Sequence, residues 1–185
     1  MASVGNLDLI FGFTSFFAAA SSMLRDLRID IQKPQTEKSV KRENKRGKAM
    51  KKTGGCLCGQ IRYETKAEPM MTGVCHCKNC QKQGGSAFST LAAFQKADIE
   101  FTGDLALYED SDTDTGSTVS RYFCGTCGSP IYSAIPSQPD MAYLKTGTLD
   151  DTDGFVAMFH CWSSTKQEWV ELSPDVPAFP QNPTG

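Results

Sequence analysis

The sequence predicts a small, mostly-β domain that depends on bound metal for part of its stability. Short runs carrying β-branched or aromatic residues alternate with glycine and proline after Thr53. No stretch of a dozen residues there keeps a 3.6-residue apolar period. Seven of the eight cysteines lie in three tight clusters. A small fold with few helices has a limited core, and a metal ion can compensate for this.

Four runs are predicted to be strands because apolar and polar positions roughly alternate within them. They are residues 60–67 (QIRYETKA), 87–94 (AFSTLAAF), 117–123 (STVSRYF) and 141–147 (MAYLKTG). One short helix is expected at residues 77–84, CKNCQKQG. No solenoid or propeller repeat, phosphate-binding loop or dinucleotide fingerprint is present in the sequence.

Charge divides the chain into an N-terminal extension and a domain. The 185 residues suffice for one domain with a tail. Residues 33–52 hold nine Lys or Arg against Glu37 and Glu43, a net charge of +7, whereas residues 53–185 carry −8. A basic run with almost no apolar residues cannot bury enough surface to fold, so it is interpreted as a disordered linker. We therefore expect residues 1–49 to be an extension and residues 53–185 to form a zinc-binding domain.

The apolar run LIFGFTSFFAAA, residues 9–20, is the only candidate for a targeting segment. Twelve residues are too few to span a bilayer. Basic residues do not precede the run, as they would in a signal peptide, and Asp8, Asp26 and Asp30 disfavour a mitochondrial presequence. We expect a cytoplasmic protein with no membrane span, in which this run contributes nothing to the domain.

The first and third cysteine clusters each place two thiols on a glycine-containing turn. They are Cys56 and Cys58 in GCLCG, and Cys124 and Cys127 in CGTCG. Clusters two or three residues apart are typical of metal sites, whereas disulfide frameworks spread their cysteines along the chain. Together these four residues, hereafter the four-cysteine cluster, are the ligand set of a closed structural zinc site. A shared ion would tie two distant parts of the domain together.

The middle cluster, CHCKNC, supplies Cys75, Cys77 and Cys80, hereafter the three-cysteine cluster. Three protein ligands leave one coordination position open, which is typical of catalytic zinc. Two alternatives stay open: His76 or Cys161 could close the site as a fourth ligand. We expect His76 to support the site rather than bind the ion. A redox role for either C-x-x-C pair is less favoured, because neither lies in a βαβ pattern.

The ligand chemistry indicates a sulfur substrate. Three thiolates donate more charge than the histidines and carboxylates of hydrolytic zinc sites, leave the site formally at −1, and make the ion soft. The zinc deaminase pattern needs H-x-E and P-C-x-x-C motifs, which do not occur here. Lys78, Lys82 and Arg121 could contact substrate carboxylates by their charge, although solvation at the surface is the more usual role of such residues.

Five segments carry a resemblance to a known family. They are GGCLCGQIRYE, CHCKNCQKQGGSAF, RYFCGTCGSPIY, LKTGTLDD and WSSTKQEWVELSPDVPAFPQNP, in this order along the chain. They resemble the motifs of the glutathione-dependent formaldehyde-activating enzyme family, which also contains centromere protein V. The resemblance runs from about Thr53 to Pro183, with seven cysteines in register, and covers nothing before Met50.

The resemblance implies a β-tent-like fold and two zinc ions per chain. One zinc would be structural, bound by Cys56, Cys58, Cys124 and Cys127, and one catalytic, bound by Cys75, Cys77 and Cys80. The activity it implies is that of a carbon-sulfur lyase forming S-hydroxymethylglutathione from glutathione and formaldehyde. We expect a small thiol, with glutathione as the candidate, to bind as substrate, and we expect no binding to nucleic acid. Whether the protein forms a homodimer stays open. The alternative is a non-catalytic zinc module resembling centromere protein V, which would use the basic run at 33–52 to bind acidic partners.

Overall fold

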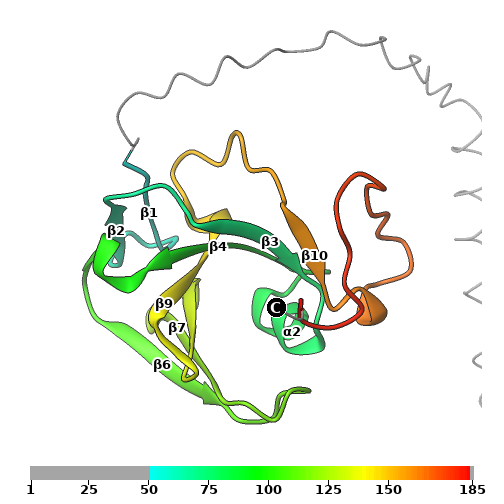
Figure 1. Cartoon of the computed structure of the whole chain (residues 1–185). Coiled ribbons are helices and arrows are strands. Elements are labelled where there is room, and N and C mark those ends of the chain that lie inside the picture. The colour runs from blue at the N-terminus through cyan, green and yellow to red at the C-terminus, as the bar shows by residue number, and fades with distance from the viewer. Residues whose placement is uncertain (1–50, 184–185) are drawn as a thin grey trace, which may run out of the picture. The chain divides into compact units, whose positions relative to one another are not determined.

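The computed structural model describes residues 51–183, and in them the predicted mostly-β architecture is confirmed (Figure 1). The expected run at 60–67 contains β2, those at 87–94, 117–123 and 141–147 overlap β4, β7 and β9, and the short helix is α2. The ten strands are β1 (Thr53–Gly55), β2 (Arg62–Thr65), β3 (Met71–Cys75), β4 (Ser89–Gln95), β5 (Ile99–Thr102), β6 (Leu105–Asp110), β7 (Val119–Cys124), β8 (Pro130–Ile135), β9 (Gln138–Lys145) and β10 (Phe159–Cys161). The helices are α2 (Lys78–Gly84) and three 3-10 turns, η1 (Lys96–Asp98), η2 (Thr146–Thr148) and η3 (Ser163–Thr165).

The strands form two sheets. One has three strands in the order β1-β2-β5, and the other has seven in the order β10-β3-β4-β9-β8-β7-β6. Neighbouring strands are antiparallel except β10 and β3, which are parallel with Cys161 opposite Cys75. The chain leaves β9 in the interior of the larger sheet and returns through a long connection to β10, which forms the edge of this sheet beside β3.

The main hydrophobic core joins the two sheets. Ile61 and Tyr63 from the smaller sheet region pack in one cluster with Phe94, Ile131 and Leu144 from the larger sheet. All five are buried, so residues from both sheets close this core between them.

A second, smaller core lies at the β3–β10 edge of the larger sheet. Cys75, Cys80, Cys161 and Trp162 are buried there. Figure 1 shows α2 close to β10 and to the last described residues, drawn in red. The last described residues run alongside β10, where the Trp162 indole N–H donates to Asn182 at 2.8 Å.

No helix within residues 51–183 is long and apolar enough to cross a membrane. The predicted extension 1–49 and most of the basic run 33–52 lie outside the described residues.

Candidate metal centres

The four-cysteine cluster is assembled from two turns that are distant in sequence. Cys56 and Cys58 follow β1, whereas Cys124 ends β7 and Cys127 lies in the turn to β8. The four sulfurs lie within 4.8 Å of one another, with 3.5 Å between Cys56 and Cys58. The Cys58 and Cys124 sulfurs are 3.7 Å apart. Sulfurs bound tetrahedrally to one zinc lie about 3.8 Å apart, so this cluster could hold zinc.

Local backbone geometry explains how the two turns present their sulfurs. Gly59 and Gly128, each directly after the second cysteine of its pair, have φ of 79° and 75°, a conformation that favours glycine. The Ile61 amide donates to the Cys56 sulfur at 3.2 Å. Hydrogen bonding by Ser129, through its hydroxyl and backbone, lowers the pKa of Cys127 to about 5. Such donors favour the thiolate form that binds metal.

The three-cysteine cluster lies where β3 leads into α2. Its sulfurs are within 4.8 Å of one another. Cys75 and Cys80 are buried, and Cys77 is half-buried. The Cys77 sulfur caps α2 by accepting the Cys80 amide at 3.3 Å. Hydrogen bonds with Cys75 and Cys77 hold the pKa of the Cys80 thiol well below its usual value. Three converging sulfurs with one side near the surface could hold zinc and leave a position for another ligand.

His76 and Cys161, the two alternative ligands, lie beside this cluster without joining it. His76 is fully buried, and its Nε2 is 3.0 Å from Nδ1 of His160. Its Nδ1 has no hydrogen-bond partner. Cys161 is adjacent to Cys75 on the neighbouring strand, but its sulfur does not lie within 4.8 Å of all three cluster sulfurs. The structure thus groups three cysteines, and places the histidine next to them.

A buried ion pair flanks the three-cysteine cluster. The Arg121 Nε donates to Asp110 at 2.7 Å, and both side chains are 6% exposed. The Asn79 amide donates to both oxygens of Asp110, and Arg121 Nη1 donates to Gln83. Although burial opposes it, hydrogen bonding to Asp110 raises the pKa of Arg121. The expectation that Arg121 is solvated at the surface is wrong, because β7 turns this side chain inward toward Asp110 of β6.

The two lysines named from sequence lie around α2. The Lys78 ammonium donates to the Thr165 carbonyl at 3.0 Å. Lys82 borders a shallow hollow of about 460 Å³. Its other lining residues are Gln81, Gly85, Ser86, Ala87 and Gln167. This hollow lies on the helix that carries Cys80.

Sequence reasoning missed Lys145, at the end of β9. Its side chain is buried, and its ammonium donates to the Ser89 hydroxyl at 3.4 Å. Burial lowers the pKa of Lys145, and negative charge at Cys80 opposes this effect. Alternation in the predicted strand at 141–147 could have placed Lys145 on the sheet face opposite to that of Leu144. Nothing in the sequence indicates which residues cover the face that carries Lys145.

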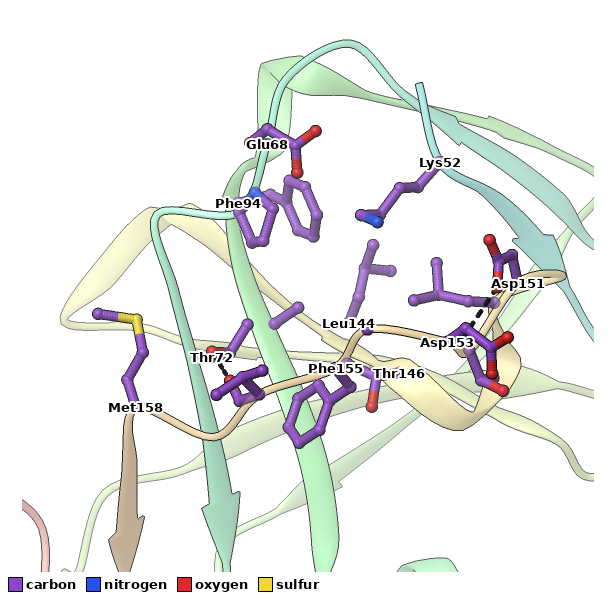
Figure 2. A pocket seen from close by; sticks show the side chains of 16 residues that line it. Lys52, Glu68, Thr72, Phe94, Leu144, Thr146, Asp151, Asp153, Phe155 and Met158 are labelled. Carbon is purple, nitrogen blue, oxygen red and sulfur yellow. Dashed lines mark hydrogen bonds between the residues drawn. The ribbon is translucent and has the colours of Figure 1, made fainter. Parts of the chain in front are cut away.

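A separate cavity of about 370 Å³ contains no cysteine in its lining (Figure 2). Figure 2 shows Phe94, Leu144 and Phe155 in its wall, with Lys52 and Asp151 near its edge. Thr72 lines the cavity, and successive residues of a strand point to opposite faces of the sheet. Gly73 and Cys75 therefore face away from Thr72, and the cavity and Cys75 lie on opposite faces. The cavity is therefore not part of the three-cysteine cluster.

Comparison with known proteins identifies the family. Residues 51–165 match the model of the family described as glutathione-dependent formaldehyde-activating enzyme. The chain belongs to this family. The match covers both cysteine clusters of this family member, together with Lys145 and the Arg121–Asp110 pair.

Among solved structures, a crystal structure of a Rhodobacter sphaeroides protein is similar to this family member. Sequence identity is 24% and the TM-score is 0.43, over 56% of this chain and 90% of that chain. A search of curated proteins found no match.

Proposed function

We propose that this protein is a zinc-dependent enzyme of the carbon-sulfur lyase type that acts on a small thiol or its adduct. The expected reaction joins glutathione and formaldehyde to form S-hydroxymethylglutathione. A bond forms between the thiol sulfur and the carbonyl carbon, the C=O double bond becomes single, and the thiol proton ends on the oxygen. The observation that carries the proposal is the convergence of Cys75, Cys77 and Cys80, with their sulfurs within 4.8 Å of one another.

When bound at the three-cysteine cluster, zinc would supply a soft Lewis acid that favours a sulfur ligand and lowers the pKa of a coordinated thiol. Cys75 and Cys80 anchor the site from the interior, whereas half-buried Cys77 is the member nearest solvent. A substrate sulfur therefore approaches from the Cys77 side. The four-cysteine cluster is proposed to bind a second, structural zinc, which gives two ions per chain.

The shallow hollow on α2 is the proposed position of the rest of the thiol substrate. Gln81 and Gln167 border it, and the two amide side chains are joined by a hydrogen bond of 3.3 Å. Lys82 adds a positive charge at the same hollow. The Gln81 amide is already bound to the His76 and Thr165 carbonyls, so Lys82 and the Gln167 amide are the groups that suit a peptide-like thiol carrying carboxylates, which agrees with glutathione.

Calorimetry with glutathione and S-methylglutathione tests the proposal. If the sulfur enters the site as thiolate, glutathione binds with release of about one proton, and S-methylglutathione, which has none to release, binds much more weakly. Titrations in buffers of different ionisation enthalpy count the proton directly. Equal affinity for both compounds without proton release would remove the mechanism, even though the family membership stands.

The second hypothesis, a non-catalytic zinc module resembling centromere protein V, depends on the basic run at 33–52. Only Lys51 and Lys52 of that run lie among the described residues, and Lys51 forms an ion pair with Glu64. The alternative, a homodimer and a cytoplasmic location all stay predictions.

A further inference from the structure

We propose that Lys145 balances the charge of the three-cysteine cluster, offsetting the negative charge that three thiolates leave on a divalent ion. The inference rests on the proposed function, and it assigns the residue that lets this site accept a further thiolate. Lys145 is a positioning residue in this proposal, because it acts on the cluster through charge rather than by touching the reacting atoms.

Register places Lys145 on the same face of the sheet as the cluster. Lys145 pairs with Leu91 across the β9–β4 boundary, and Ser89, two residues before Leu91, pairs with Cys75 across the β4–β3 boundary. Residues two apart on a strand share a face. The Ser89 hydroxyl accepts from the Lys145 ammonium at 3.4 Å and donates to the Cys80 carbonyl at 3.2 Å. Ser89 thus links the ammonium to the cluster.

The burial of Lys145 requires a compensating negative charge. The residue is 6% exposed, and within residues 51–183 its ammonium forms no ion pair with a carboxylate. Buried ammonium groups are usually paired, because removal of their hydration is costly. The three-cysteine cluster lies on the same face of the sheet and is linked to the ammonium through Ser89, and it carries negative charge when its thiols bind a divalent ion. The cluster is therefore the partner of this lysine.

Charge counting shows why Lys145 matters more than its neighbour Arg121. A divalent ion with three thiolates carries a formal charge of −1, which one ammonium cancels. Arg121 also places positive charge beside Cys80, but it shares this charge with Asp110 in a buried ion pair. A substrate thiolate would add a further negative charge, and within residues 51–183 Lys145 is the buried cation near the cluster that forms no ion pair with a carboxylate. The four-cysteine cluster has less need of such a residue, because Cys58 is exposed and solvent screens its charge.

The test uses the zinc-loaded full chain and neutral variants of Lys145. Lys145→Met keeps the side chain up to its last carbon and removes the charged nitrogen, Lys145→Arg keeps the charge, and Lys145→Gln is a second neutral variant if Lys145→Met folds poorly. Lys66→Met is the control, since Lys66 is half exposed and paired with Glu100 in the smaller-sheet region. The first measurement is the chelator concentration that removes half of the more weakly held zinc.

We expect the neutral variants to lose that zinc at about 10- to 100-fold lower chelator concentration, while Lys145→Arg and Lys66→Met resemble the wild type. Wild-type zinc retention in a folded neutral variant would overturn the inference. The same result in Lys66→Met as in Lys145→Met would also overturn it, because loss of any lysine would then suffice.

The second measurement separates charge from damage to the site. Neutral variants should bind glutathione about tenfold more weakly, while their affinity for S-methylglutathione is unchanged, because only the thiol contributes a negative charge. Equal losses for both compounds would indicate damage and contradict the inference. If the wild type binds neither compound but the neutral variants still lose zinc, the charge-balancing role holds and the proposed function fails.

Discussion

At the residue scale, individual cysteines should differ in what their loss does. Cys77→Ser should leave the chain folded with one zinc fewer and without activity, because this half-buried residue belongs to the three-cysteine cluster at one edge of the larger sheet. Cys124→Ser should leave the chain largely insoluble, because its buried sulfur helps join the turn after β1 to the β7–β8 turn. Elemental analysis of the soluble fraction checks both. Identical behaviour of the two variants would refute the division into structural and catalytic sites.

The buried ion pair of Arg121 and Asp110 gives a second residue-scale prediction. Arg121→Met leaves the Asp110 carboxylate buried without its cation, so we expect the free energy of unfolding to fall by about 3–5 kcal/mol. Urea denaturation of the zinc-loaded protein measures this. The matched control is Arg62→Met, which removes an exposed pair with Asp150 and should change stability far less. Equal effects of the two substitutions would show that burial does not determine the strength of the Arg121 pair.

At the scale of elements, the C-terminal segment should stabilise β10 and the smaller core. His160 donates its amide to the Pro177 carbonyl and accepts from the Phe179 amide, both at 2.8 Å. Trp162, which has a positive φ of 58°, donates its backbone amide to Gln181 at 3.1 Å. The segment therefore extends the sheet beyond its β10 edge. Residues after 165 lie outside the family match, so this extension belongs to the part of the chain that the match does not cover.

A chain ending at Val176 tests this element. We expect a loss of about 1 kcal/mol for each backbone hydrogen bond removed, and a shift of Trp162 fluorescence to longer wavelength, because the indole becomes exposed. Trp169 is already 72% exposed, so its emission should not shift. A chain ending at Pro183 is the control. Unchanged stability and fluorescence in the shorter chain would mean that the segment does not hold β10 in place.

At the scale of the whole molecule, the domain should fold without the N-terminal extension. The main core and both cysteine clusters are made from residues within 51–183. A chain starting at Met50 should therefore bind the same amount of zinc as the full chain and melt at the same temperature, as measured by elemental analysis and calorimetry. A lower melting temperature with unchanged zinc content would instead assign a stabilising role to the apolar run at 9–20.

The sequence alone determined the features that depend on local spacing. Alternating apolar residues at 87–94 and 117–123 predicted strands, because the side-chain period of a strand is read from neighbouring positions. The close spacing of Cys75, Cys77 and Cys80 predicted that their sulfurs converge, since a short turn leaves them little freedom to separate. The other six strands of the described residues escaped prediction. Among them, Gly73 interrupts the run of β3, and the three residues of β10 are too few to establish alternation.

Only the tertiary structure decided which residues surround the three-cysteine cluster. Cys161 lies beside Cys75 because β10 returns to the sheet edge in parallel, a pairing that no local pattern encodes. Arg121 is buried because β6 and β7 place Asp110 within reach, and the sequence alone suggested a surface position for it. Lys145 reaches the cluster across β4, through Ser89. Burial and charge pairing depend on contacts between distant segments, so they follow from the packing of the strands and not from the order of the residues.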